Sequence, residues 1–342
     1  MEADVTPNLG GPFMQHRVLG RTGREVSTIG LGTWQFGGDF GRVEEADAYA
    51  VMDAAAEHEV TIFDTADVYG DGLSEQLIGK WLAKNPEWTG LVATKMIRRA
   101  EEPSLEHATA ENFQAWVDRS RKNLGRDTLD LVQLHCPNDD VFDSDAVFDR
   151  LDALVESGAI AHYGISVETV DQALSAIARP NVASVQIILN AFRQKPLEKV
   201  LPAAREAGVG IIARVPLASG LLSGRYTKDT TFEASDHRSY NRSGEAFDIG
   251  ETFSGVDFAT GVDAAAQFSE LAEQEGLKPT TAALAWIIQS SGVSTVIPGA
   301  RNAEQAQQNA EAGAAPQLSD DFRAAVRKLY ADRIAPSVQD RW

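Results

Sequence analysis

Four side chains of different chemistry, Asp64, Tyr69, Lys95 and His135, could together move a proton to or from a carbonyl oxygen. A phenol such as Tyr69 has an ordinary pKa of about 10, which is too high for a well-matched acid near neutral pH. A nearby ammonium would stabilise the phenolate and lower that pKa, and a carboxylate would hold the ammonium charged and in place. We therefore expect Tyr69, Lys95 and Asp64 to act as a coupled unit. His135 would donate a hydrogen bond to the carbonyl oxygen and orient the substrate.

The positions of these residues indicate how a fold could bring them together. Asp64, Lys95 and His135 each end a short apolar run, and Ser166 and Arg214 end later ones. One polar residue at such a place can simply mark where a strand reaches the surface. An acid, a base and an imidazole on three successive strands favour a shared site, because strand ends meet at the carboxyl-terminal mouth of a barrel.

Short apolar runs alternate along the chain with amphipathic stretches of helical length, which is typical of βα units and a parallel sheet. The predicted strands cover residues 26–32, 60–64, 91–95, 129–135, 161–166, 184–190, 210–214 and 294–299. The predicted helices cover residues 44–58, 74–84, 104–124, 143–157, 169–178, 195–207, 263–290 and 302–313. Eight units favour a closed (β/α)₈ TIM barrel over an open doubly wound sheet, which usually has about five or six parallel strands.

Segments outside the eight units extend the predicted barrel at both ends. Residues 1–14 read as a flexible arm without the features of a signal peptide, and residues 15–342 as a single domain. The segment 16–27 has a Gly-bearing turn between extended pieces, which predicts a β-hairpin that could plug the amino-terminal end of the barrel. Residues 318–333 predict an extra C-terminal helix with Ser319 or Asp320 as its N-cap.

A long segment after the seventh strand interrupts the alternation. Residues 224–261 are rich in Gly, Ser, Thr, Asp and Arg and show no clear period. A loop of this length in a compact domain is usually functional or disordered, so we interpret it as a substrate or cofactor cover rather than a passive insertion. Arg238 and Arg242 within it are interpreted as surface charges.

Composition narrows the class of protein. The 342 residues include 43% hydrophobic residues, but no apolar run is long enough to cross a bilayer. The net charge of −19 argues against binding nucleic acid or an anionic membrane surface. Cys136 is the only cysteine, so an intramolecular disulfide is impossible and a reducing cytoplasm is the natural location. The six histidines are scattered along the chain, so no metal site is expected. Strand alternation should turn Cys136 away from the site, as a packing residue.

The motifs FDTADVYG, LVATK, LVQLHCP, GIS, SVQIILN, PLASGLLSGRY and TVIPGARNAEQAQQN stand in the order and spacing of the aldo-keto reductase superfamily. The chain resembles this family over roughly residues 15–335, and looks closest to bacterial members related to the potassium-channel β subunits. The resemblance implies that Asp64, Tyr69, Lys95 and His135 are the catalytic four. It also implies a nicotinamide cofactor, with NADPH preferred and NADH possible, and a small carbonyl or alcohol substrate.

The same resemblance assigns the binding residues. Trp34, Phe36, Tyr69 and His135 would contact the substrate. The residues expected to bind the cofactor are Gly32, Thr33, Trp34, Asp64, Ser166, Gln186, Arg214, Pro216, Leu217, Ser219, Gly220, Leu221, Gly299, Ala300, Arg301, Gln305, Gln308 and Asn309. A guanidinium such as that of Arg301 suits a 2′-phosphate and can stack on adenine.

Three positions depart from the family pattern. Val167 stands where the family often has Asn, so one amide contact to the cofactor is missing. Arg214 stands where an aromatic residue often stacks on the nicotinamide, and it could either stack with its planar face or bind the pyrophosphate. The basic residue that many relatives place at position 299 is also absent, which weakens the preference for NADPH.

Two functions remain compatible with the sequence. The first is an NADPH-dependent oxidoreductase that reversibly reduces an aldehyde, ketone or sugar carbonyl, with Tyr69 as general acid and base. The second is a cofactor-binding, redox-sensing or regulatory subunit on the same fold with little turnover. A barrel lyase or isomerase would leave the segment around Arg301 unexplained.

Overall fold

The computed structural model of the chain describes residues 13–38, 41 and 43–342. Most of the arm predicted for residues 1–14 therefore lies outside the described residues. The described chain opens with an antiparallel hairpin of β1 (His16–Val18) and β2 (Glu25–Ser27), as predicted. Leu19 and Val26 of this hairpin are buried in a cluster with residues near the beginnings of the barrel strands, such as Ile62 and Leu91. The hairpin thus plugs the amino-terminal end of the barrel.

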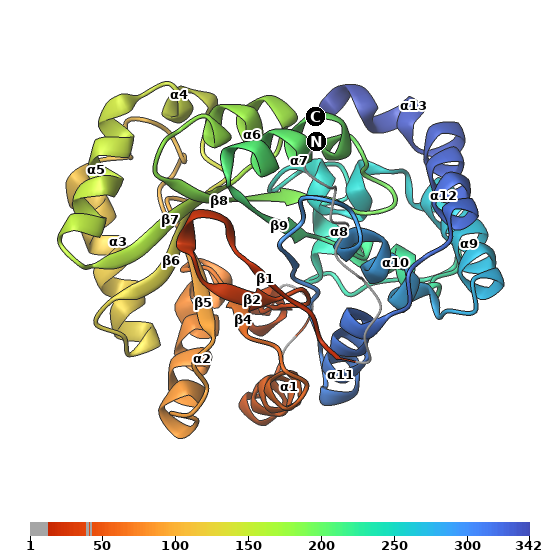
Figure 1. The fold of residues 1–342 in the computed structure, drawn as a ribbon, viewed down its shortest axis with the longest axis horizontal. Helices are drawn as coiled ribbons and strands as arrows, with labels where there is room; N and C mark the ends of the chain where they lie inside the picture. The colour runs from red at the N-terminus through yellow and green to blue at the C-terminus, as the bar shows by residue number, and fades with distance from the viewer. Residues whose placement is uncertain (1–12, 39–40, 42) are drawn as a thin grey trace, which may run out of the picture.

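The central sheet consists of eight parallel strands that pair in chain order (Figure 1). They are β3 (Leu31–Gly32), β4 (Ile62–Asp64), β5 (Leu91–Met96), β6 (Leu129–His135), β7 (Ile160–Ser166), β8 (Val182–Ile188), β9 (Gly210–Arg214) and β10 (Thr295–Val296). Parallel bridges from Ile29 to Val296 and from Gly32 to Gly299 join the last strand to the first. This closure confirms the predicted (β/α)₈ barrel.

Helices surround the strands (Figure 1), and buried apolar residues of both belong to one core cluster. The helices up to the seventh strand are α1 (Glu45–Glu57), α2 (Leu73–Lys84), α3 (Ala110–Leu124), α4 (Asp139–Phe142), α5 (Asp145–Glu156), α6 (Val170–Ile177) and α7 (Pro196–Ala207). Local signals delimit them: the Thr109 hydroxyl accepts from the Asn112 amide at the start of α3, and Gly125 ends it with a φ of 64°.

Two predicted elements are divided in the structure, and the helix predicted over residues 104–124 begins only at Ala110. The expected strand 26–32 is divided, because residues up to Ser27 pair within the hairpin and only Leu31 and Gly32 form β3. The expected helix 263–290 is two helices, α9 (Phe258–Gln274) and α10 (Pro279–Ile288). Gly276, with a φ of 76°, and Pro279 at the start of α10 provide the physical reason for the break.

The segment between β9 and α9 contains four short helical turns. They are η4 (Ala218–Ser223), α8 (His237–Tyr240), η5 (Ile249–Glu251) and η6 (Phe253–Gly255). Residues 224–257 of this segment are called the β9–α9 loop below. Because β9 ends at Arg214, the loop starts from the carboxyl-terminal mouth of the barrel, where (β/α)₈ enzymes carry their active sites.

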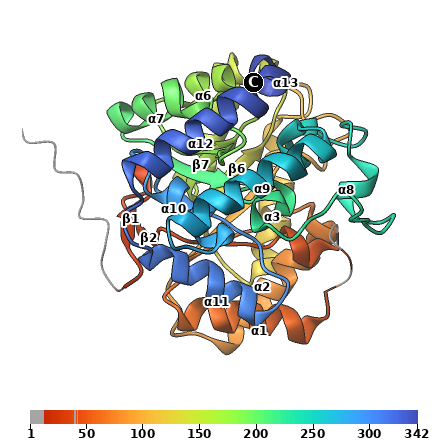
Figure 2. The same cartoon turned by 90° about the vertical axis from the view of Figure 1, so that its right-hand side faces the viewer.

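The last part of the chain completes the helical layer. It comprises α11 (Ala303–Glu311), η7 (Ala312–Ala314), α12 (Asp320–Arg333), α13 (Ala335–Val338) and η8 (Gln339–Arg341). The Ser319 hydroxyl accepts from the Phe322 amide and caps α12, which confirms the predicted extra helix. Figure 2 shows α9, α10, α11 and α12 together on one side of the barrel.

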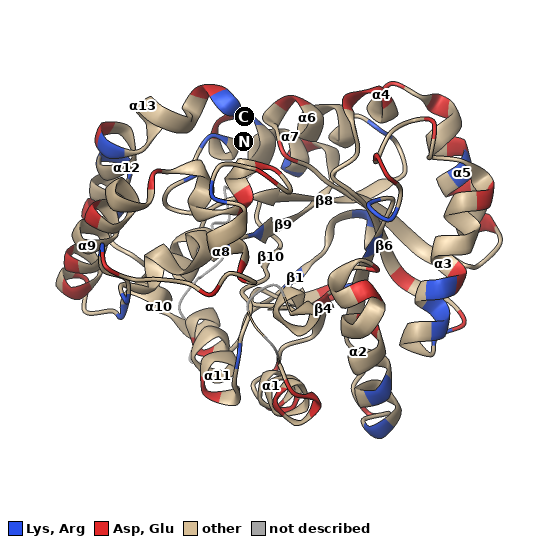
Figure 3. Cartoon of the chain, turned by 180° about the vertical axis from the view of Figure 1, so that it is seen from behind, with Lys and Arg blue, Asp and Glu red and all other residues tan. Residues whose placement is uncertain are grey.

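Acidic residues are spread over the surrounding helices, whereas the strands carry few charges (Figure 3). Among the described residues, no helix combines the length and the apolar character needed to span a bilayer.

Candidate active site

Three strand ends bring the expected catalytic side chains to one rim of the barrel. Asp64 is the last residue of β4, Lys95 the penultimate residue of β5 and His135 the last residue of β6. Tyr69 follows β4 by five residues and begins η3 (Tyr69–Gly72). Because these strands run parallel and in adjacent register, their carboxyl ends lie side by side.

Lys95 connects the acid and the phenol. Its Nζ lies 2.5 Å from Asp64 Oδ1 and 3.4 Å from the Tyr69 hydroxyl, and it also donates to the Thr65 carbonyl at 2.8 Å. The ring of His135 meets the ring of Tyr69 edge to face, with centroids 5.9 Å apart. The structure thus brings together all four residues that the sequence singled out.

Two amides hold the second oxygen of Asp64. Gln186 Nε2 donates to Asp64 Oδ2 at 2.7 Å and Gln133 Nε2 donates to the same atom at 3.1 Å. Gln133 was missed by the sequence analysis, although it is a polar residue inside the apolar run of β6 and is wholly buried. The carboxylate therefore has fixed partners on both oxygens and can orient Lys95.

Burial shifts the pKa values of three of these expected catalytic groups. Burial raises the pKa of Tyr69, and the charge of Lys95 opposes this shift without cancelling it. The expected net lowering of the Tyr69 pKa is therefore wrong for the protein without ligands, because removal of water outweighs the ammonium. Burial alone would lower the pKa of Lys95, but Asp64 and Tyr69 raise it, so the ammonium stays charged. Burial, followed by the charges of Arg98, Lys95 and Arg214, lowers the pKa of His135 well below its ordinary value.

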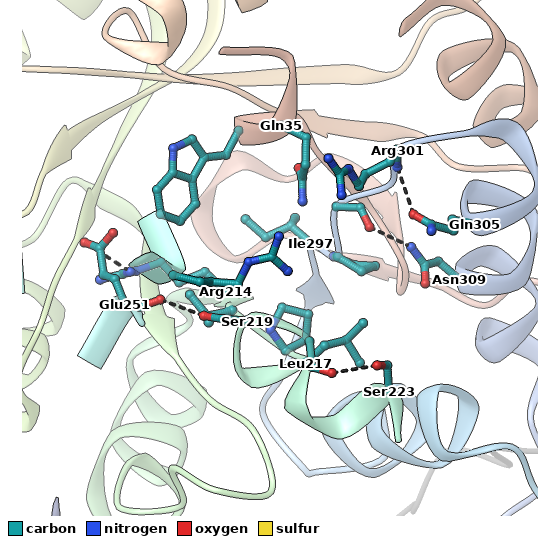
Figure 4. Close-up of a pocket in the computed structure, with 18 of the residues that line it drawn as sticks. Gln35, Arg214, Leu217, Ser219, Ser223, Glu251, Ile297, Arg301, Gln305 and Asn309 are labelled. Carbon is teal, nitrogen blue, oxygen red and sulfur yellow. Dashed lines mark hydrogen bonds and ion pairs between the residues drawn. The ribbon is translucent and has the colours of Figure 1, made fainter. Parts of the chain in front are cut away.

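A cavity of about 540 Å³ extends from these groups along the barrel mouth. Tyr69, His135 and Trp34 line one end, and Arg301 and Gln305 line the other. Figure 4 shows Arg214 and Glu251 on one side of the cavity and Arg301, Gln305 and Asn309 on the opposite side. The volume falls within the range of about 300–1,000 Å³ that is usual for small-molecule and cofactor sites.

Most of the expected cofactor residues line this cavity. They are Gly32, Thr33, Trp34, Asp64, Gln186, Arg214, Pro216, Leu217, Ser219, Gly220, Gly299, Arg301, Gln305, Gln308 and Asn309. Asn309 Nδ2 donates to the Gly299 carbonyl at 3.1 Å, and Gln305 Oε1 accepts from the Arg301 amide at 3.0 Å. These bonds fix the start of α11 against the strand that precedes it.

Four expected contact residues do not line the cavity. Phe36 is 1% exposed and belongs to the apolar core, so its assignment as a substrate contact is wrong. Its place is taken by Gln35, which faces the cavity because residues 34–37 form a 3-10 turn rather than a strand. Leu221 and Ala300 are likewise buried core residues, and Ser166 is wholly buried.

The β9–α9 loop contributes a wall that sequence reasoning did not resolve. Tyr226, Phe232, Asp236 and Arg238 line the cavity, which supports the interpretation of this loop as a cover. The Arg238 guanidinium forms a paired contact with Asp236, donates to the Tyr226 hydroxyl at 2.5 Å and lies over the Phe232 ring at 4.4 Å. Arg238 is 8% exposed, so its interpretation as a surface charge is wrong. In the sequence, the only local indication that Arg238 could be buried is Asp236, a possible ion-pair partner two residues away.

Aromatic side chains from the loop meet the catalytic end of the cavity. The Trp34 ring stacks on the Tyr69 ring with centroids 6.1 Å apart. The Trp34 ring also contacts the rings of two residues of the β9–α9 loop. Its centroid lies 4.8 Å from that of His237 and 5.7 Å from that of Phe247, which meets it edge to face. Trp34 therefore links the Tyr69 ring to the loop.

Comparison with known proteins assigns this geometry to a family. The chain matches the Aldo/keto reductase family over residues 28–331, which is nearly its whole length. The protein is an aldo/keto reductase. Membership in this family, together with the oxidoreductases among its relatives, makes it an enzyme of the oxidoreductase class.

Relatives and solved structures of aldo/keto reductases agree with this assignment. The chain is 29% identical to the aldo-keto reductase YhdN of Bacillus subtilis, with 85% of this chain and 86% of the relative covered. It is 33% identical to the uncharacterized oxidoreductase Rv2298 of Mycobacterium tuberculosis, covering 88% of each. The structure of the glycerol dehydrogenase AKR11B4 from Gluconobacter oxydans superposes with a TM-score of 0.74 at 26% identity, covering 94% of this chain and 96% of that one.

Arg214 occupies a position where aldo/keto reductases often have an aromatic residue that stacks on the nicotinamide. Its Nη2 donates to Glu168 Oε1 at 2.8 Å and to the Val167 carbonyl at 3.2 Å, and it lies 3.5 Å from Cys136 Sγ. The guanidinium therefore sits beside the ends of β6 and β7, at the catalytic end of the cavity. This position opposes the alternative in which Arg214 binds pyrophosphate.

Cys136 in this aldo/keto reductase is buried and is not among the residues that line the cavity, in agreement with its interpretation as a packing residue. Its Sγ lies 3.5 Å from Ser166 Oγ. Cys136 directly follows β6 and has a φ of 50°, so strand alternation no longer applies to it. Ile97 after β5 and Val215 after β9 also have positive φ, so the strained backbone gathers at the mouth of the barrel.

Proposed function

We propose that the protein reversibly reduces the carbonyl group of a small aldehyde, ketone or sugar, with Tyr69 as general acid in reduction and general base in oxidation. The observation that carries this proposal is the 3.4 Å contact between the Tyr69 hydroxyl and Lys95 Nζ at the wall of the 540 Å³ cavity. A phenol linked to a charged ammonium and facing a ligand-sized cavity is suited to proton exchange with a bound oxygen.

Each catalytic residue has a distinct part in the proposed reaction. Tyr69 gives its proton to the carbonyl oxygen, and Lys95 stabilises the phenolate that remains. His135 is neutral because burial lowers its pKa, so it donates one N–H to the same oxygen without adding a charge. Asp64 acts through Lys95, which it holds in place at 2.5 Å.

The cavity fits a nicotinamide dinucleotide, which supplies or accepts the hydride when bound. Gln35 Oε1 and Arg214 Nε are buried at the cavity and have no hydrogen-bond partner among the described residues, so a polar ligand could satisfy them. Arg301 at the far end would pair with a 2′-phosphate, which is the reason for proposing NADPH over NADH. Gly220 and Ser219 would lie along the pyrophosphate.

The Tyr69→Phe variant tests the acid assignment. It should bind NADPH as the wild type does, because the binding residues are intact, while kcat for carbonyl reduction falls by about 10²–10⁴-fold. Binding is measured by fluorescence titration and turnover by NADPH oxidation with a panel of aldehydes, ketones and sugars. Substantial activity in the Phe variant would refute Tyr69 as the acid. Tight NADPH binding without turnover of any carbonyl would instead favour the redox-sensing role.

The proposal extends to the setting of the reaction. We infer that residues 15–342 work as a single domain, and that the partner of the protein is a small carbonyl or alcohol compound. A chain whose only cysteine is Cys136 needs no oxidising compartment, so the cytoplasm is the proposed location.

A further inference from the structure

Four charged side chains form a cluster beside the catalytic end of the cavity. They are Arg98, Glu168, Arg214 and Glu251, and the cluster is called the ion quartet below. Arg98 Nη2 lies 3.0 Å from Glu251 Oε1 and 3.5 Å from Glu168 Oε1. Arg214 Nη2 lies 2.8 Å from Glu168 Oε1, and its Nη1 lies 3.5 Å from Glu251 Oε1. Each guanidinium therefore contacts both carboxylates.

The ion quartet is little exposed to solvent. The side chains of Glu251 and Arg214 are 7% and 9% exposed, and those of Glu168 and Arg98 are 14% and 22% exposed. Charges with so little surrounding water are weakly screened, so each acts strongly on its neighbours. Cys136, Glu168 and Glu251 offer potential metal ligands within 4.8 Å of one another, but both carboxylates are already paired with guanidiniums.

Glu251 comes from the β9–α9 loop, whereas Arg98 and Glu168 follow barrel strands and Arg214 is the last residue of one. Its carbonyl accepts from the Ser219 hydroxyl at 3.0 Å, which ties the loop to η4. The preceding Gly250 has no room for a side chain, since a Cβ there would lie 2.2 Å from Arg193 Nη1 and 2.9 Å from the Trp342 ring. Arg193 in turn lies 3.7 Å from the centroid of that ring. Tight packing around the backbone thus places the Glu251 carboxylate against Arg214.

Arg214 is the member of the ion quartet that meets the cofactor region. It lines the same cavity as Tyr69 and His135 and contacts Cys136 and Val167. Any ring that exchanges hydride with a carbonyl held by Tyr69 must lie at this end of the cavity. An oxidised nicotinamide ring carries a positive charge and the reduced ring carries none, so the two forms respond differently to a nearby charge.

We propose that Arg214, partly neutralised by Glu251, sets the relative affinity of the cavity for oxidised and reduced nicotinamide cofactor. This inference rests on the proposed function. The guanidinium of Arg214 disfavours the cationic oxidised ring, and the carboxylate of Glu251 reduces that penalty. Glu251 is a positioning residue, because it acts on the cofactor through Arg214. The balance between the two charges thereby favours release of the oxidised cofactor after reduction without preventing its binding.

Charge-neutralising variants with opposite expected effects test the proposal. Dissociation constants for NADPH and NADP⁺ are measured by calorimetry, and the ratio Kd(NADP⁺)/Kd(NADPH) is compared between proteins. In E251Q the ratio should rise on the order of tenfold, because Glu168 alone then balances the two guanidiniums of Arg98 and Arg214. In R214M the ratio should fall by a similar factor, and in R214K, which keeps the charge, it should stay near the wild-type value. General damage to the cavity would weaken the binding of NADPH and NADP⁺ alike and leave the ratio of their dissociation constants unchanged.

A matched control and the combined variant complete the test. E206Q removes the same formal charge from an exposed position in α7, so its ratio should equal that of the wild type. The variant carrying both E251Q and R214M should return toward the wild-type ratio. The proposal is overturned if the E251Q and R214M ratios change by less than about twofold, or in the same direction. If the wild type binds neither NADPH nor NADP⁺, the proposed cofactor fails instead, so the two failures are distinguishable.

Discussion

The ammonium nitrogen of Lys95 lies 3.4 Å from the hydroxyl of Tyr69, at a site where Lys95 is buried and Tyr69 is half-buried at the wall of the cavity. Burial of the phenol and the charge of the ammonium act on the Tyr69 pKa in opposite directions. The pKa of Tyr69 therefore depends on the charge of Lys95, and Asp64 holds Lys95 in place.

Lys95→Met should move the alkaline limb of the kcat profile to higher pH. The charge of Lys95 lowers the Tyr69 pKa, so its removal leaves burial, Asp64 and Glu251, which raise that pKa, opposed only by the smaller effect of Arg98. Initial rates measured across the pH range check this expectation. Lys80→Met, which removes an exposed lysine of α2, should leave the limb in place. If the alkaline limb of the Lys95→Met profile stayed at the wild-type pH, Lys95 would not influence the ionisation of Tyr69.

The same substitution should destabilise the protein unless Asp64 is neutralised as well. Lys95 and Asp64 form a buried ion pair, and loss of one partner of such a pair costs about 3–5 kcal/mol. Denaturant unfolding should therefore show a large loss in Lys95→Met and a partial recovery when Asp64→Asn is added. If the double variant is as unstable as the sum of the two single variants, the two residues do not depend on each other.

Arg301→Leu should weaken the binding of NADPH more than that of NADH. A charge-assisted hydrogen bond contributes about 1.5–3 kcal/mol, so the Kd for NADPH should rise about 10–100-fold while the Kd for NADH changes little. Fluorescence titration with both cofactors measures the two constants. Arg327→Leu, at an exposed position of α12, is the matched control. Equal weakening of both cofactors would show that Arg301 does not read the 2′-phosphate.

Tyr226→Phe should speed the release of NADPH. The Tyr226 hydroxyl donates to the Ser219 carbonyl at 3.2 Å and accepts from Arg238 at 2.5 Å, and these bonds hold the β9–α9 loop over the cavity. Their loss should raise the dissociation rate about tenfold, as measured by stopped-flow fluorescence. Tyr49→Phe, which removes a hydroxyl bonded to Glu45 on α1, should have no such effect. A dissociation rate equal to that of the wild type would argue against the loop as a cover.

Asp67→Asn should reduce the loss of stability that the wild type undergoes as pH rises. Burial raises the pKa of Asp67 to about 8, and its carboxyl oxygens have no hydrogen-bond partner in the described part of the chain. An acid whose folded pKa lies above its unfolded value of about 3.9 contributes stability that is lost as pH rises toward 8. The melting temperature of the wild type should thus fall between pH 5 and 9, and that of the variant should fall less. Asp127→Asn, at an exposed position, should follow the wild type. Parallel curves for the wild type and the Asp67 variant would contradict the expectation.

The positions of the catalytic groups could be predicted because they depend on local pattern. Each apolar run specifies a strand, and Asp64, Lys95 and His135 stand at strand ends, which parallel pairing must gather at one rim. The hairpin at residues 16–27 and the cap at Ser319 were predictable for the same reason, since turns and caps involve residues close in sequence.

Other features of the site depend on contacts between distant segments. Glu251 meets Arg98 across 153 residues of chain, and nothing near either residue indicates the pair. Cys136 turns toward Ser166 because a left-handed backbone ends the strand alternation, and Phe36 enters the core because residues 34–37 form a turn.

The sequence by itself determined the barrel, the rim and the identity of the four groups that meet there, because periodicity and strand-end chemistry are local properties. Only the tertiary structure decided which side chains of the β9–α9 loop face the cavity, how strongly burial shifts the pKa of Tyr69, and which charges surround Arg214. Those outcomes depend on how much water the packed chain excludes and on which remote segments it brings within a few ångströms, and neither is encoded in any short stretch of residues.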